Sequence, residues 1–146
     1  MPKHAEIRQV PFTAQQMFDL VADVARYPEF LPWCVATRIR RQDHEEMIAD
    51  MVIGFKGFRE SFTSRVTLNS PVMVNVNYEN GPFKYLTNKW NFSNIDSGCE
   101  IDFHVNFAFK SRILETAIGV VFDDAVHRMV SAFEARATIL YGKDPQ

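Results

Sequence analysis

Cysteine is scarce in this chain, and its scarcity excludes several classes of protein. The 146 residues contain two cysteines, Cys34 and Cys99, which are too few and too far apart in the sequence to form a metal-binding motif. The first residues do not resemble a secretory signal with an apolar core, so we expect a reducing compartment, the cytoplasm. A chain of this length can bury enough apolar surface without disulfides or metal to fold as one domain, residues 1–146.

Long apolar runs and a large excess of charge are also lacking. No run approaches the roughly 18 apolar residues that a membrane-spanning helix needs, so any membrane contact would be peripheral. The net charge of -2 provides no general attraction to polyanions. The densest basic run, residues 38–41, is followed at once by acidic residues, which favours a solvated hairpin over a nucleic-acid surface. We therefore expect no DNA partner.

The common catalytic motifs are missing as well. The chain has no G-x-S-x-G elbow, Walker loop, dinucleotide fingerprint, H-E-x-x-H or paired C-x-x-C motif, and we predict no enzyme, no metal and no cofactor. Asp123 and His127 have the spacing of two metal ligands, but a stable site needs more, and a surface ion pair is favoured. Strand alternation places His104 on an outer face, and only a slipped register would make it an acid–base group in a cavity.

The residues that are present divide the chain into elements. A short strand is expected over residues 5–10, and Thr13 with Gln16 then has the spacing of a helix capping box. This helix should end near Arg26, because Pro28 cannot continue it. From residue 35 to residue 110 apolar residues recur with a period of two between short turn sequences, which predicts an antiparallel meander. Ser111 then caps one long terminal helix.

This order of elements predicts an α+β fold of the helix-grip type. A curved antiparallel sheet of about six or seven strands can close only by wrapping around the long C-terminal helix. Such an arrangement leaves a tapered space between sheet and helix, which becomes a ligand cavity where side chains do not fill it.

The chain is rich in phenylalanine, with thirteen, and these rings fill either a core or a pocket. Residues 24–34 bring three aromatics and two prolines into one rigid turn, which suits either a cavity mouth or a hydrophobic plug. Residue type alone favours a close-packed core. The candidate ligand-binding residues are Phe30, Trp33, Phe55, Phe62, Phe83, Trp90, Phe103, Phe107, Val121, Met129 and Phe133.

One hairpin is a candidate for membrane contact. Phe55 and Phe58 stand beside two glycines and Lys56 at its tip, a combination that can enter a membrane interface. An ordinary buried hairpin end is the alternative. Cys34 follows a tryptophan in apolar surroundings, which should raise the pKa of its thiol and make it unreactive.

Three motifs carry a family resemblance. They are VARYPEFLPWC at residues 24–34, VIGF at 52–55 leading to FTSRV at 62–66, and GPFKYL at 81–86 before Trp90 and Phe92. Together they resemble the coenzyme Q-binding Coq10 family, a branch of the superfamily of START (Bet v 1-like) and polyketide cyclase/dehydrase proteins. The resemblance spans nearly the whole chain.

The resemblance implies a bacterial START-like lipid-binding domain that binds ubiquinone or a late precursor and delivers it for biosynthesis or respiration without catalysis. Such a protein would work in the cytoplasm, at the inner face of the membrane. Two alternatives stay open. Some bacterial members are described as ribosome-associated toxins, and polyketide members are aromatases or cyclases. An enzyme would need an acid–base group in the cavity, for which His104, Tyr78 and Tyr85 are the candidates.

Overall fold

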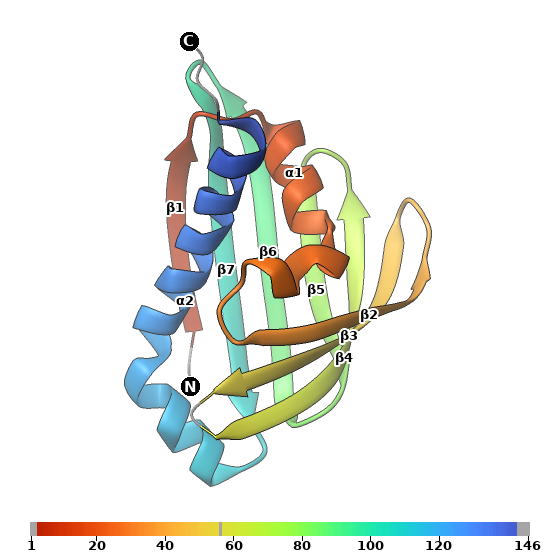
Figure 1. The fold of residues 1–146 in the computed structure, drawn as a ribbon, viewed down its shortest axis with the longest axis vertical. Coiled ribbons are helices and arrows are strands. Elements are labelled where there is room, and N and C mark those ends of the chain that lie inside the picture. The colour runs from red at the N-terminus through yellow and green to blue at the C-terminus, as the bar shows by residue number, and fades with distance from the viewer. Residues whose placement is uncertain (1–2, 56, 143–146) are drawn as a thin grey trace.

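The described residues, 3–55 and 57–142 of the computed structural model, form a curved seven-stranded antiparallel sheet and two helices (Figure 1). The strands are β1 (Lys3–Val10), β2 (Cys34–Gln42), β3 (Glu46–Phe55), β4 (Phe58–Asn69), β5 (Met73–Asn80), β6 (Phe83–Ile95) and β7 (Gly98–Phe109). Their order in the sheet is β1-β7-β6-β5-β4-β3-β2. The strands from β2 to β7 thus pair with their sequence neighbours, as short turns require, and β1 joins the far edge beside β7.

Helix α1 (Ala14–Ala22) begins at the predicted capping box. The Thr13 hydroxyl accepts a hydrogen bond from the Gln16 backbone at 3.0 Å, and the Gln16 side chain accepts one from the Thr13 backbone at 2.9 Å. The predicted end near Arg26 is wrong, because the α-helix stops at Ala22 and a 3₁₀-helix, η1 (Val24–Glu29), follows. This tighter helix contains Pro28 and ends one residue after it.

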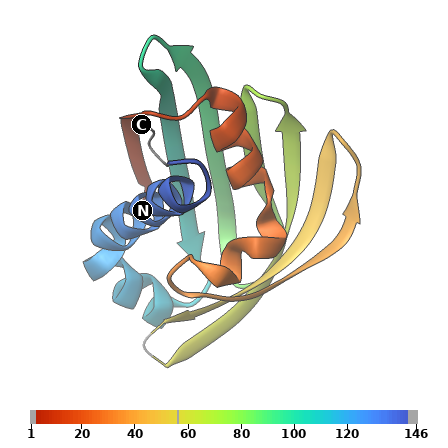
Figure 2. The ribbon, with the colours of Figure 1, turned by 45° about the horizontal axis from the view of Figure 1, so that its top comes forward.

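Helix α2 (Arg112–Tyr141) is the long terminal helix that the sequence predicts. The Ser111 side chain accepts a hydrogen bond from Leu114 N at 3.3 Å and so caps its first turn. Figures 1 and 2 show α1, η1 and α2 on the same concave side of the sheet. Buried residues of α2 recur every three or four positions, at Phe122, Val126, Val130 and Phe133. The helix-grip prediction is confirmed.

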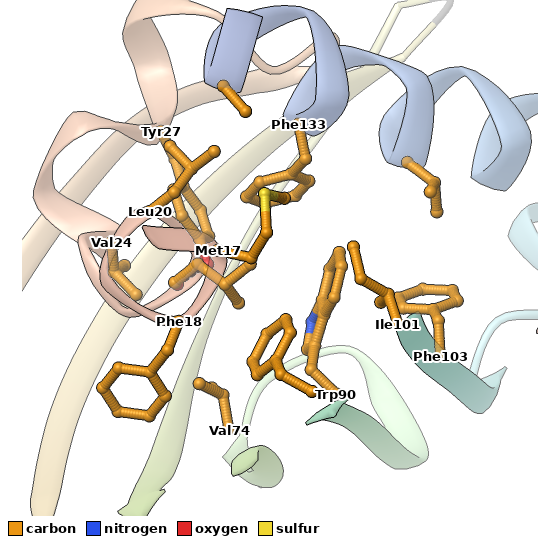
Figure 3. Close-up of a cluster of buried hydrophobic side chains, with 14 of the residues drawn as sticks. Met17, Phe18, Leu20, Val24, Tyr27, Val74, Trp90, Ile101, Phe103 and Phe133 are labelled. Atoms are coloured by element: carbon orange, nitrogen blue, oxygen red, sulfur yellow. Dashed lines mark hydrogen bonds between the residues drawn. The ribbon is translucent and has the colours of Figure 1, made fainter. Parts of the chain in front are cut away.

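The core fills one part of the space between helices and sheet (Figure 3). Met17 and Leu20 of α1 and Phe133 of α2 approach Trp90 of β6 there, and Figure 3 shows their side chains turned toward one another. Trp90 is 2% exposed, with its ring centroid 4.6 Å from that of Phe103. A second, smaller cluster of buried side chains is formed by Phe83, Phe109 and Leu114.

Candidate functional site

A cavity of about 270 Å³ lies between the sheet, η1 and α2. Strands β3 to β7 supply most of its wall, the turn after η1 supplies a second part, and the middle of α2 supplies a third. Alternation along each strand turns apolar side chains toward it and polar ones outward. On β4, for example, Phe62 and Val66 line the cavity, whereas Thr63 on the opposite face donates to Asp50 Oδ1 at 2.6 Å.

Most of the predicted ligand-binding residues with described side chains meet at this cavity. Those that line it are Trp33, Phe62, Phe83, Trp90, Phe107, Met129 and Phe133. The side chains of Phe55, Phe58 and Val121 lie outside the described residues. Their roles in ligand or membrane contact, like the ligand-binding role of the whole set, stay predictions.

The other two predicted residues, Phe30 and Phe103, pack beside the cavity and are not part of its lining. Phe103 is fully buried against Trp90 in the core. Phe30 follows η1 and meets the Phe133 ring edge-on, with the ring centroids 5.3 Å apart. Both residues therefore support lining side chains, Trp90 and Phe133, from behind.

The turn that joins η1 to β2 holds an unusual backbone conformation. Trp33 has φ 65°, in the left-handed region that bulky residues seldom adopt. Such a conformation costs on the order of 1–3 kcal/mol and persists where surrounding structure enforces it. The Trp33 carbonyl accepts a hydrogen bond from Gly54 N at 2.9 Å, which ties this turn to β3. Trp33 is also a lining residue of the cavity.

An ion pair joins η1 to α2 beside the cavity. Arg136 Nη2 lies 2.6 Å from Glu29 Oε1, and the guanidinium stands 5.2 Å from the centre of the Phe30 ring. The hydrogen bond from Arg136 lowers the pKa of the Glu29 carboxyl, and Arg26 contributes to the same effect. The ion pair therefore connects η1 with α2, the two helices that contribute to the cavity wall, and it does so outside the apolar lining.

The few polar side chains in the cavity wall are mostly engaged with the protein itself. Asn88 Nδ2 donates to the His104 carbonyl at 2.9 Å, and Asn88 Oδ1 accepts from Trp90 Nε1 at 3.0 Å. The Tyr27 hydroxyl donates to the Val21 carbonyl, and burial raises the pKa of Tyr27. Burial likewise raises the pKa of the Cys34 thiol to about 11, which keeps it protonated and unreactive near neutral pH.

The candidate acid–base groups are not among the residues that line the cavity. The His104 side chain is 52% exposed on the outer face, where its Nε2 lies 2.9 Å from Asp102 Oδ1, as alternation predicts. Tyr78 and Tyr85 are half-buried but do not line the cavity, and the Tyr78 hydroxyl accepts a hydrogen bond from Phe83 N at 3.2 Å. Among the described lining residues there is no carboxylate, imidazole, amine or guanidinium.

No cluster of three or more metal-ligating side chains occurs among the residues that the structure describes. The Asp123 side chain lies outside them, so the suggested Asp123–His127 pair is not described. Asp124 and Arg128, one residue further along, form the surface ion pair expected of this spacing, at 2.8 Å.

A cluster of unpaired cations, which the sequence pattern does not reveal, lies at one end of the sheet. Arg59, Lys84, Lys110 and Arg112 are exposed, and none has a carboxylate partner within the described chain. They flank three turns at the lower end of Figure 1, two of which are joined by a 2.8 Å hydrogen bond from Lys110 N to the Pro82 carbonyl. Ile113, which is 72% exposed, follows Arg112 in the sequence. We call these five residues the cationic end.

A curved antiparallel sheet that closes on a long helix around an apolar cavity defines a START-like helix-grip protein. The chain belongs to the polyketide cyclase / dehydrase and lipid transport family, whose model matches residues 10–134. Within residues 3–55 and 57–142, no helix has both the length and the apolarity that a membrane crossing requires.

Relatives within the family carry different names. The chain is 40% identical over 139 residues to the ribosome association toxin RatA of Rickettsia prowazekii, covering 92% of this chain and 94% of the relative. It is 33% identical over 129 residues to the mitochondrial coenzyme Q-binding protein COQ10 of Drosophila melanogaster, covering 85% of this chain and 53% of that protein. The 18 kDa protein CC1736 of Caulobacter crescentus, known from a solution structure, is 34% identical with a TM-score of 0.78, covering 98% and 100% of the two chains.

Proposed function

We propose that this protein binds ubiquinone, or a related polyprenyl quinone or lipid, in the cavity and carries it without catalysing a reaction. The observation that carries this proposal is the apolar cavity of about 270 Å³, whose described wall holds no charged side chain. Burial of each CH₂ group contributes about 0.8 kcal/mol, so an isoprenoid tail can bind against such an apolar wall with few hydrogen bonds or charges. The cavity is small beside typical ligand pockets of ~300–1,000 Å³, and a long tail would extend beyond it.

The cellular role that we propose is to chaperone the quinone for ubiquinone biosynthesis and respiratory electron transport. The lipid-transport description of the family and the coenzyme Q-binding relative support this role. The carrier would work in the bacterial cytoplasm with peripheral contact at the inner membrane, through the hairpin of Phe55 and Phe58 and the adjoining cationic end. The lack of an acid or base in the described lining supports a carrier over an aromatase or cyclase.

Extraction of the purified protein tests the proposal directly. Protein made in a quinone-producing host and purified without detergent should release a quinone in about equal molar amount into organic solvent. Ultraviolet absorption and mass spectrometry would identify it. An empty extract, together with no uptake of added ubiquinone, would contradict the carrier and favour the second candidate below.

That second candidate is a ribosome-directed inhibitor of translation. The observation that favours it is the 40% identity, over 92% of this chain, to a protein named a ribosome association toxin. The net charge of -2 argues against broad attraction to RNA. The cationic end nevertheless offers four exposed cations that could contact phosphate groups.

Charge reversal at the cationic end separates the two candidates. The double variant Lys110→Glu with Arg112→Glu should lose about tenfold or more of its binding to vesicles of phosphatidylcholine with phosphatidylglycerol, because each cation near an anionic surface contributes about 1 kcal/mol. Lys89→Glu, an exposed cation on β6 away from this end, is the matched control.

The same variants are then sedimented with ribosomal subunits across a salt series. A loss confined to vesicle binding supports the carrier. Salt-dependent sedimentation with subunits that the double variant loses, with no vesicle binding by the parent protein, would instead support the translation inhibitor.

A further inference from the structure

Ser64 is a lining residue of the cavity whose hydroxyl has no partner in the protein. It lies on β4 between Phe62 and Val66 on the inward face, opposite Ala49 of β3 and Tyr78 of β5 in the register of the sheet. Its side chain is 5% exposed, and its Oγ atom is buried with no hydrogen-bond partner. Two other buried polar atoms of the described chain lack a partner, Asn75 Oδ1 and Arg136 Nε, but neither residue lines the cavity.

The other polar side chains of the cavity wall form hydrogen bonds within the protein or are weak donors. Both ends of the Asn88 amide are occupied by protein groups, and the Tyr27 hydroxyl donates to a backbone carbonyl. The thiol of Cys34 is at best a weak donor. Ser64 therefore offers a strong donor that the folded protein leaves unused.

A buried hydroxyl without a hydrogen bond destabilises the folded protein. A bound ligand could supply the missing hydrogen-bond acceptor. Leaving such a group unsatisfied costs about 1–3 kcal/mol. A buried water needs two to four polar partners to be stable. Of the residues beside Ser64 in the sheet, Ala49, Phe62 and Val66 are apolar, and the hydroxyl of Tyr78 already accepts a hydrogen bond from Phe83 N at 3.2 Å. A ligand that brings its own oxygen atom is better suited, because the rest of its surface can contact the apolar wall.

We propose that the Ser64 hydroxyl donates a hydrogen bond to an oxygen atom of the bound ligand, a quinone carbonyl in the case of a polyprenyl quinone. The polar ring then lies against β4, and the isoprenoid tail follows the aromatic side chains away from it. Ser64 thus selects amphiphiles with an oxygen acceptor at one end over plain hydrocarbons. This inference rests on the proposed lipid-binding function and names the residue that orients the ligand.

The test compares two probes on three proteins. Ubiquinone with a two-unit tail carries carbonyl oxygens, whereas farnesene is a hydrocarbon without oxygen. Each is titrated by calorimetry into the parent protein, into Ser64→Ala, and into Ser61→Ala, which removes an exposed hydroxyl from the same strand. Ser64→Ala should bind the quinone about three- to tenfold more weakly and bind farnesene unchanged. Ser61→Ala should match the parent protein with both probes.

Stability of the empty protein provides a second measurement. Ser64→Ala should unfold at the same temperature as the parent protein or higher, because an unsatisfied hydroxyl has been removed. A lower unfolding temperature than that of Ser61→Ala would mean that Ser64 is bonded within the protein, and the inference would be wrong. Equal quinone affinity of Ser64→Ala and the parent protein would overturn it as well. If the parent protein binds neither probe, the carrier function itself fails, and this inference fails with it.

Discussion

Replacing Val76 with tryptophan is expected to remove most ligand binding while the fold persists. Val76 lies on β5, half-buried, with its side chain in the cavity wall, and it pairs across the sheet with Val66 and Asn88. An indole at this position would occupy space that a bound tail needs. Displacement of three or four methylene groups from the cavity weakens binding about a hundredfold, at about 0.8 kcal/mol for each group.

The measurement is a titration with the short-tailed ubiquinone, together with a thermal melt of each protein. Val72→Trp is the matched control, since Val72 is 48% exposed in the connection between β4 and β5 and does not line the cavity. The extra ring can cost the fold about 1–3 kcal/mol if it meets its neighbours, which the melt would reveal. Unchanged quinone affinity in a folded Val76→Trp would show that the ligand binds elsewhere.

The strand pattern was readable from the sequence because each signal is local. Turn residues mark the breaks, alternation marks the inward face, and the capping box of Thr13 and Gln16 marks the start of α1. The end of α1 was not readable in the same way. Proline at position 28 excludes only an α-helical continuation, and the choice of a 3₁₀-helix from Val24 depends on contacts with distant elements, such as the packing of Tyr27 against Phe133.

The cavity itself could not be predicted from the sequence. Phe103 and Phe107 share the inward face of β7, yet Phe103 is fully buried in the core and Phe107 lines the cavity. Periodicity assigns a residue to a face, but the distance between α2 and the sheet decides whether that face is filled. The partition between core and cavity is therefore a tertiary property.

Ser64 and the cationic end, to which we give proposed roles, both escaped sequence reasoning for related reasons. Ser64 belongs to an alternating inward set, and a serine between Phe62 and Val66 is the signal that could have drawn attention to it. Its unused hydroxyl is visible only once the neighbours on β3 and β5 are known. The cationic end gathers residues from three separate turns, so no dense basic run marks it in the sequence.

Replacing Trp90 with alanine is expected to have the largest effect on stability. Its ring centroid lies 4.6 Å from that of Phe103 and 4.9 Å from that of Phe133, so the indole joins β6 to both β7 and α2 (Figure 3). Loss of a buried tryptophan costs about 3–5 kcal/mol, out of a typical total of ~5–15 kcal/mol. The unfolding temperature should fall by about 10 °C or more.

Trp90→Phe separates the packing of Trp90 from its hydrogen bond. The phenyl ring keeps most contacts with Phe103 and Phe133 but leaves Asn88 Oδ1 without the indole donor that stands 3.0 Å away, at a cost of about 1–3 kcal/mol. Calorimetric melts should therefore rank the parent protein above Trp90→Phe and Trp90→Phe above Trp90→Ala. Equal melting temperatures for all three proteins would mean that this part of the core does not hold α2 on the sheet.

The two substitutions separate the cavity from the core that adjoins it. Val76→Trp fills part of the cavity with side-chain volume and should change affinity far more than stability. Trp90→Ala removes side-chain volume from the core and should change stability far more than affinity. Because Trp90 is also a lining residue of the cavity, a folded Trp90→Ala protein below its melting temperature has more room for the tail and should still bind the quinone. A different result is a Trp90→Ala protein that is folded but no longer binds the quinone. Trp90 would then be an essential ligand contact, and one side chain would serve both the stability of the core and the binding of the ligand.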